Sequence, residues 1–252
     1  MIIDLTGQRV VVAGGSRGIG RAIALAMAEA GASVSICARG AAALEVTRGE
    51  IAAFGHPTHA APCDLSEIAD IEAYIAAAAA ALGGIDVLVN NATGHGNTGT
   101  EESWDASLNV DLMAAVRASR AAGPFLSGAR GANIINIASG SGLNPSPRTP
   151  AYGAAKAAVI HFTRTQAATL ASAGIRANCI APGSIEFPGG VWDTRKSDNP
   201  TLYNATLANC PMGRMGRAEE VADVAVFLAS SRASWVTAQV ISVNGAQGLR
   251  GL

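Results

Sequence analysis

The feature that most constrains the fold of this chain is a group of glycines that directly follows a short apolar run. Residues 9–13 read Arg-Val-Val-Val-Ala, which is typical of a buried strand, and Gly14, Gly18 and Gly20 come next. Residues 19–30 then have a helix-forming composition. A strand, a turn almost free of side chains and a helix together predict a β–α unit in which the helix packs closely on the strand.

The alternation of strand-like and helix-like segments continues along most of the chain. The strand-like segments are apolar throughout, as in parallel strands that helices cover on both faces. Right-handed crossovers then predict a single-domain α/β fold, a doubly wound Rossmann-type parallel sheet flanked by helices. Strands are expected at 9–13, 33–38, 58–61, 86–89, 133–138, 175–180 and 240–243, and helices at 19–30, 41–53, 66–82 with Ser66 as its cap, 102–122, 152–171 and 218–229. Residues 182–211 are expected to form an irregular insertion, because proline, glycine and polar residues are frequent there.

Composition excludes several classes of protein. Of the 252 residues, 49% are hydrophobic and 15% are charged, which excludes a disordered, highly charged chain. The net charge is -1, and binding to phosphate backbones needs concentrated positive charge. Neither a nucleic acid nor a membrane is therefore expected as a partner.

The cysteines and the N-terminus favour a cytoplasmic protein. Cys37, Cys63, Cys179 and Cys210 lie far apart, which favours free thiols in a reducing compartment over a disulfide framework or a zinc site. Asp4 lies where a signal peptide needs a basic start, and no apolar segment is long enough to span a bilayer. The histidines show no ligand spacing, so no metal site is expected.

The glycine-rich turn also has a chemical implication. The N-terminus of a helix presents unpaired backbone N–H groups and a partial positive charge, and together these bind phosphate. Gly14 can adopt a turn conformation that side chains disfavour, Gly18 lets a pyrophosphate approach the backbone, and Gly20 lets the helix approach the sheet. A tight turn without a ligand is the alternative, but the position of the turn at the first β–α junction favours a dinucleotide site.

Tyr152 and Lys156 form a second chemical pattern. Residues four apart on a helix share a face, so these two side chains are expected to lie together. A phenol is a poor base near neutral pH, and a nearby ammonium lowers the pKa of a phenol by stabilising the phenolate. Such a pair suits general acid/base catalysis, whereas a surface Tyr/Lys pair without function is the alternative.

The order of these motifs resembles the short-chain dehydrogenase/reductase family. The glycine spacing is G-x-x-x-G-x-G rather than the usual G-x-G-x-x-G, and residues 152–156 read Tyr-Gly-Ala-Ala-Lys. The resemblance covers nearly the whole chain. Its other matches are Asp64, Asn90-Asn91-Ala92, Asn109, Ser139, Pro182-Gly183 and Val243-Asn244-Gly245.

The resemblance implies an oxidoreductase with a nicotinamide cofactor and assigns roles to single residues. It makes Tyr152 the general acid/base, with Lys156 tuning the tyrosine and binding the nicotinamide ribose. It makes Ser139 the residue that orients the substrate oxygen, with Ser141 as a less well placed competitor. Asn109 resembles the asparagine that holds a proton-relay water near the lysine. The residues implied to bind the cofactor are Gly14, Ser16, Arg17, Gly18, Ile19, Gly20, Arg39, Asp64, Leu65, Asn91, Ala92, Tyr152, Lys156, Pro182, Gly183 and Ile185.

Four positions depart from the family pattern. Ala13 replaces a threonine whose side chain braces the glycine turn, and Ala138 replaces a frequent second serine. Thr93 replaces a glycine beside the expected cofactor site. Phe187 stands where a threonine often bonds the nicotinamide amide, so that contact is expected to be absent or supplied by the backbone or Ser184.

The end of the second strand predicts the choice of cofactor. An acid there would accept hydrogen bonds from the ribose 2′-OH of NADH, but this chain has Ala38. Arg39 follows directly and Arg17 lies in the glycine turn, and a guanidinium binds phosphate through paired, charge-assisted bonds. NADPH is therefore expected, with NADH as the alternative.

These residues predict an NADPH-linked enzyme that interconverts a ketone and a secondary alcohol, with similarity to the 3-oxoacyl-reductase branch of the family. The alternatives are an NAD-linked dehydrogenase of a cyclic or aromatic alcohol, and a non-catalytic cofactor-sensing protein on the same fold. A substrate lid is expected at 184–211, with Phe187, Trp192 and Tyr203 as candidates for an apolar wall and His95 as a further candidate for substrate contact. The resemblance and the alanine-rich helices at 102–122 and 152–171 predict a homotetramer.

Overall fold

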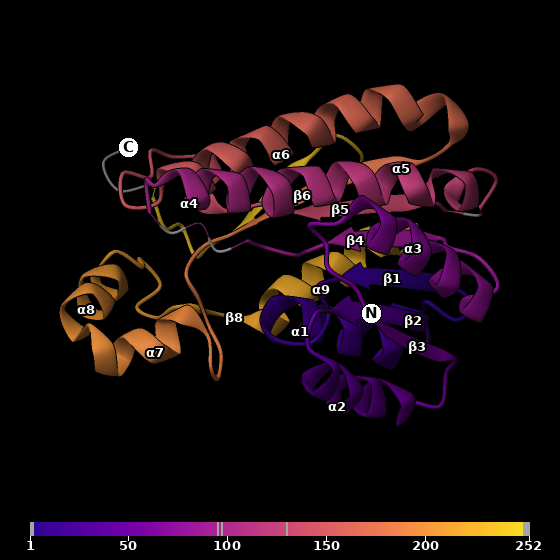
Figure 1. The fold of residues 1–252 in the computed structure, drawn as a ribbon, viewed down its shortest axis with the longest axis horizontal. Coiled ribbons are helices and arrows are strands. Elements are labelled where there is room, and N and C mark those ends of the chain that lie inside the picture. Colours follow the sequence, from indigo (N-terminus) through magenta and orange to yellow (C-terminus); the bar gives the residue numbers. More distant parts are fainter. Residues whose placement is uncertain (1–2, 95, 97, 130, 249–252) are drawn as a thin grey trace.

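Parallel strands form one sheet with helices on both of its faces (Figure 1). The computed structural model describes residues 3–94, 96, 98–129 and 131–248. The sheet has seven strands in the order β3-β2-β1-β4-β5-β6-β9. The chain moves outward from β1 (Arg9–Ala13) to β3 (Thr58–Pro62) and then returns to start the other half at β4 (Val87–Asn90). This confirms the predicted doubly wound α/β fold, with its switch point between β1 and β4.

The expected strands and most of the expected helices are present, with small shifts at their ends. The remaining strands of the sheet are β2 (Ser33–Ala38), β5 (Asn133–Ile137), β6 (Arg176–Pro182) and β9 (Val240–Val243), and a separate pair is formed by β7 (Ile185–Glu186) and β8 (Gly216–Arg217). The helices are α1 (Gly18–Glu29), α2 (Ala41–Ala52), α3 (Ile68–Leu82), α4 (Glu101–Ala106), α5 (Ala114–Leu126), α6 (Pro150–Leu170), α7 (Val191–Asp198), α8 (Pro200–Ala208) and α9 (Ala218–Ala229).

The two faces of the sheet pack against different helices. Val10 and Val12 of β1 belong to the core shared with α1 and α9, whereas Val11 belongs to the core shared with α3 and α5. Figure 1 shows α1, α2 and α9 on one side of the sheet and α4, α5 and α6 on the other. Because both faces are covered, the strands are apolar at successive positions, as the sequence indicated.

A buried polar network fixes α6 against the middle of the sheet. Asn136 on β5 accepts a hydrogen bond from Asn90 of β4 at 2.8 Å and donates to Thr163 and Gln166 of α6 at 2.9 and 2.8 Å. Asn136 and Thr163 are fully buried. Because buried polar groups are costly when left unpaired, this network specifies how α6 lies on the sheet. α6 carries both Tyr152 and Lys156.

Two expected segments differ from the structure. Residues 182–211 are not irregular, because they contain β7, α7 and α8. Pro200 occupies the first turn of α8, where its missing N–H costs nothing. The helix expected at 102–122 runs from Glu101 to Leu126 and is interrupted by a π-helix at Ser107–Met113. Such insertions are often found at functional sites.

The expected cap of the third helix is also wrong. The helix begins at Ile68 with Glu67 at its N-cap, and no side chain caps it. The hydroxyl of Ser66 donates to Asp64 instead, at 2.8 Å. A serine can bond the residue two positions before it, and here that local bond forms in place of the cap.

The glycine-rich turn is held by groups from three neighbouring segments. Gly14 donates through its backbone N–H to the carbonyl of Cys37 at 3.1 Å, and its own carbonyl accepts from the Asn91 amide at 2.8 Å. Thr47 of α2 donates to the carbonyl of Ser16 at 3.1 Å. Ala13 cannot supply the side-chain hydrogen bond that a threonine would give to this turn. The bonds that hold the turn come instead from β2, from α2 and from Asn91.

All four cysteines are free and buried. Among the described helices, none combines the length and the hydrophobicity that crossing a bilayer requires.

Gly20→Ala tests the close approach of α1 to β1. A Cβ at Gly20 would overlap the carbonyl oxygen of Gly14 and the amide of Asn91. We expect a loss of about 1–3 kcal/mol in the free energy of unfolding, as for other overpacked sites. Thermal or urea unfolding measures the change.

Gly49→Ala is the matched control. Gly49 lies within α2, and a Cβ there meets nothing within 4 Å. Alanine in a helix is favoured over glycine by about 0.5–1 kcal/mol, so this variant should be at least as stable as the parent. Equal stability of Gly20→Ala and Gly49→Ala would contradict the proposed packing constraint.

Candidate active site

One large cavity opens at the carboxyl ends of the parallel strands, where the strand order reverses. Its volume is about 1780 Å³, larger than the roughly 300–1,000 Å³ of a typical small-molecule pocket. A cavity of this size accommodates a dinucleotide together with a second molecule. Of the residues expected to bind a cofactor, those that line it are Gly14, Ser16, Arg17, Gly18, Ile19, Arg39, Asp64, Leu65, Asn91, Ala92, Tyr152, Lys156, Pro182, Gly183 and Ile185.

Gly20 has a different position from the other turn residues. Its Cα lies against the carbonyl of Gly14, behind the turn, so it permits the packing of α1 rather than forming the cavity wall. Gly14 and Gly18 have positive φ angles of 86° and 55°, a region that disfavours other residues. The turn therefore leaves the N-terminus of α1 open toward the cavity, as a phosphate group requires.

Charged groups that follow β2 and β3 line the cavity. Ala38, Arg39 and Asp64 all line it. The backbone N–H and the hydroxyl of Ser66 bond the Asp64 carboxylate and lower its pKa, and the positive charge of Arg39 adds a smaller effect. The end of β2 thus presents a guanidinium and no carboxylate of its own.

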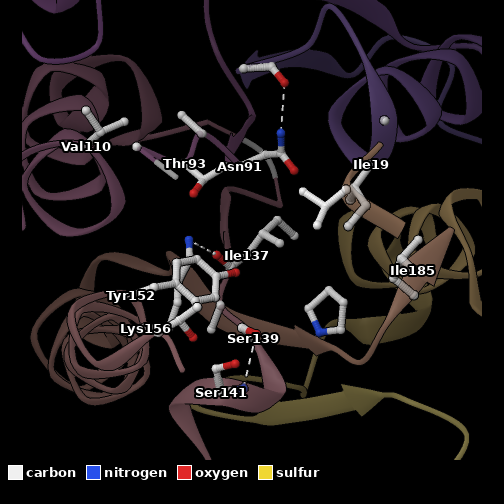
Figure 2. A pocket seen from close by; sticks show the side chains of 18 of the residues that line it. Ile19, Asn91, Thr93, Val110, Ile137, Ser139, Ser141, Tyr152, Lys156 and Ile185 are labelled. Carbon is white, nitrogen blue, oxygen red and sulfur yellow. Dashed lines mark hydrogen bonds between the residues drawn. The ribbon is translucent and has the colours of Figure 1, made fainter. Parts of the chain in front are cut away.

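Ser139, Tyr152 and Lys156 lie together at another part of the cavity (Figure 2). Ser139 is the second residue after β5. Its Oγ accepts a hydrogen bond from the Ser141 N–H at 3.1 Å. The Ser139 hydroxyl proton remains available to a ligand. Tyr152 lies in the first turn of α6, which begins at Pro150, and Lys156 lies one turn later on the same face.

Lys156 is almost completely buried and makes three polar contacts. Its Nζ donates to the carbonyl of Ile137 at 3.0 Å, lies 3.1 Å from Asp111 Oδ1 and lies 5.6 Å from the centre of the Tyr152 ring. Burial by itself would lower the pKa of Lys156, but the negative charge of Asp111 raises it, and the net shift is upward. Nearby Cys179 stays a thiol, because burial raises its pKa to about 11.

Asn109 lies elsewhere than the resemblance implied. It lines the cavity, but its amide donates to the carbonyl of Ser66 at 3.3 Å and its oxygen accepts from Arg117 at 2.7 Å. The side chain beside Lys156 is that of Asp111, two residues later. Residues two apart on a helix point in nearly opposite directions, so the two cannot both face Lys156.

Sequence reasoning did not identify Asp111 or Thr47. Nothing local to either residue indicates its contact, because the partners of Asp111 and Thr47 lie on other elements. The helical spacing of Asn109 and Asp111 indicates only that the two side chains do not share a face.

The residues expected to form an apolar wall divide into two groups. Phe187 and Trp192 line the cavity, and the Phe187 ring covers the glycine turn so closely that a Cβ on Gly18 would lie 2.5 Å from it. Tyr203 lines a smaller neighbouring cavity of about 440 Å³ and donates to Glu186 at 2.8 Å. Ser184 bonds Gln247 through both its N–H and its hydroxyl. His95 lies outside the described residues.

Known proteins are similar to this chain over nearly its whole length. A short-chain dehydrogenase family model described as enoyl-(acyl carrier protein) reductase matches residues 13–246. The 3-oxoacyl-(acyl-carrier-protein) reductase FabG of Chlamydia trachomatis is 38% identical over 96% of this chain and 97% of its own length.

Solved structures are similar over the same length. A Sinorhizobium meliloti protein described as a short-chain alcohol dehydrogenase by assignment is 34% identical, with a TM-score of 0.91 and coverage of 98% of both chains. A short chain dehydrogenase from Burkholderia cenocepacia, solved in complex with NADP, is 29% identical with a TM-score of 0.87, over 96% of this chain and 98% of its own. The chain therefore belongs to the short-chain dehydrogenase/reductase family and is an oxidoreductase.

Proposed function

We propose that the protein is an NADPH-linked oxidoreductase that interconverts a ketone and a secondary alcohol, with Tyr152 as the general acid/base. The observation that carries this proposal is the grouping of Ser139, Tyr152 and Lys156 at the wall of one dinucleotide-sized cavity. A non-catalytic cofactor sensor would not need a phenol, a hydroxyl and a buried ammonium at the same place.

The residues present fit a nicotinamide dinucleotide. The glycine turn opens the N-terminus of α1 to a pyrophosphate, and Asp64 and Leu65 line the cavity beyond the end of β3. Tyr152 and Lys156 also line the cavity and would hold the nicotinamide ribose. When bound, the cofactor would supply or accept the hydride.

The side chains then carry the proton and hold the substrate. The Ser139 hydroxyl orients the carbonyl oxygen of the ketone, because its own oxygen already accepts from the Ser141 N–H and leaves its proton to donate. Tyr152 gives its phenolic proton to that oxygen during reduction and takes one back during oxidation. The Lys156 ammonium stabilises the phenolate that remains.

The substrate end of the cavity is partly apolar. Phe187, directly after β7, lines the cavity together with Val191 and Trp192 of α7 and Leu202 of α8. Relatives named as 3-oxoacyl reductases support an acyl or other apolar ketone as the substrate class. Residues 184–211 act as the substrate lid in this proposal, and such segments vary between enzymes that share a fold.

Arg39 and Arg17 support NADPH over NADH. Ala38 presents no carboxylate to repel a 2′-phosphate, and both arginines line the cavity. The solved relative in complex with NADP supports the same choice. A guanidinium offers the paired donors that match a phosphate.

Tyr152→Phe keeps the ring but removes the transferable proton. We expect ketone-dependent NADPH oxidation to fall by about 10²–10⁴-fold, the usual contribution of general acid catalysis. NADPH binding, measured by fluorescence, should change little. Tyr74→Phe is the control, because its hydroxyl lies 2.9 Å from that of Ser35 and does not line the cavity, and its turnover should match the parent. Turnover of Tyr152→Phe within a few-fold of the parent would refute the assigned role.

Replacing Ala38 with Asp and Arg39 with Gln should shift the cofactor preference toward NADH. The change removes charge-assisted bonds to the 2′-phosphate and adds a carboxylate that repels it, so the ratio of kcat/KM for NADPH over NADH should fall about 10- to 100-fold. Arg232→Gln makes the same arginine-to-glutamine substitution at an exposed site after α9 and is the control. A parent enzyme that already prefers NADH would contradict the argument.

A homotetramer is the expected assembly. α4, α5 and α6 lie on one outer side of the sheet, and Ala154, Ala157 and Ala168 lie on the exposed face of α6. Small side chains permit close helix packing between copies. Light scattering at micromolar concentration should give four times the 25.3 kDa of one chain, and a monomer would contradict this expectation.

A further inference from the structure

The ion pair between Asp111 and Lys156 is the only salt bridge among the described residues in which both side chains are buried. The exposed fractions are 3% for the lysine and 0% for the aspartate, whereas every other ion pair has at least one side chain more than a quarter exposed. A buried charge without a partner is strongly disfavoured, so each group depends on the other.

The surroundings of Lys156 leave Asp111 as its compensating charge. Tyr152 faces it from α6, Cys179 from β6 and the uncharged carbonyl of Ile137 from β5, and Asp111 comes from the π-helix. Burial raises the pKa of the Cys179 thiol to about 11, so it carries no charge, and Asp111 brings the one carboxylate among these groups. Among the described residues, Asp111 is therefore the one acid that forms an ion pair with this ammonium.

Asp111 is also fixed from its other side. Its Oδ2 accepts a hydrogen bond from the backbone N–H of Gly94 at 3.1 Å. Gly94 follows Asn91, Ala92 and Thr93, and all four residues line the cavity. One carboxylate therefore joins a cofactor-side wall of the cavity to the helix that carries Lys156.

We propose that Asp111 is the counter-ion that keeps the buried amine of Lys156 protonated over the working pH range, and so acts as a positioning residue for the Tyr152–Lys156 pair. Its effect on Tyr152 rests on the function proposed above, whereas its effect on Lys156 does not. An amide in its place cannot balance the ammonium. The lysine would then release its proton at lower pH, and the phenolate of Tyr152 would lose its stabilising charge.

The amino-acid composition makes the test direct. Lys156 and Lys196 are the only lysines in the sequence, so protein labelled with ¹³C-lysine gives two side-chain signals whose shifts report protonation. The signal that disappears in the variant Lys196→Arg belongs to Lys196, and the remaining signal belongs to Lys156. Lys196 pairs with Glu186 on the surface and serves as an internal control in every variant.

The comparison is between the parent, Asp111→Asn and Asp111→Glu. We expect Lys156 of Asp111→Asn to titrate at least about one pH unit lower than in the parent, since a buried lysine without a counter-ion loses its proton readily. Asp111→Glu keeps the charge and should retain most of the parent behaviour. Asp223→Asn, the same change at an exposed site on α9, should leave Lys156 unchanged. Identical titration of Lys156 in the parent and in Asp111→Asn would overturn the proposal.

A second measurement covers the case in which Asp111→Asn does not fold. Adding Lys156→Met removes the uncompensated amine, so the double variant Asp111→Asn/Lys156→Met should recover folding. A double variant that is as unstable as the single one would overturn the proposal, because the defect would then not come from the ammonium.

Turnover separates this proposal from the proposed function. In the direction of alcohol oxidation, Asp111→Asn should lose activity between about pH 7 and pH 9 relative to the parent, by about tenfold for each unit that its lysine titration moves below the assay pH. A parent enzyme inactive on every ketone and alcohol tested would refute the proposed function but leave the lysine titration to decide the role of Asp111.

Discussion

The contact between Gly20 and the carbonyl of Gly14 is the constraint on which the rest of the site depends. It lets α1 begin almost at the end of β1, so that the N-terminus of the helix faces the edge of the sheet. Cys37, Thr47 and Asn91 then hold the turn from β2, from α2 and from the segment after β4. The cavity lies at the switch point because the strands on both sides of β1 end there.

The part of the cavity wall that carries Tyr152 and Lys156 depends on a different kind of interaction. Asn136 and its buried partners fix α6 on the sheet, and α6 places Tyr152 and Lys156 on the cavity wall. The ammonium of Lys156 is brought into the protein interior by this packing, and the buried carboxylate of Asp111 compensates it. Polar pairing therefore determines where the helix lies and which charge it can carry.

Much of the fold follows from local patterns. The apolar strands, the glycine turn and the spacing of Tyr152 and Lys156 involve neighbours in the sequence, so they could be recognised without a structure. The helices within residues 182–211 were harder to predict from the sequence. A proline such as Pro200 can mark either a break in the structure or the first turn of a helix. Ser66 bonded Asp64 rather than capping a helix, since both uses of a serine are local and close in energy.

The sequence by itself determined the doubly wound sheet, the glycine turn and the positions of Ser139, Tyr152 and Lys156, because periodicity and short spacings specify them. Only the tertiary structure decided that Asp111 rather than Asn109 lies beside Lys156, that Thr47 braces the turn, and that Phe187 covers Gly18. Each of these is a contact between elements far apart in the chain. Such contacts depend on how whole helices are placed, and the packing of the core determines that placement.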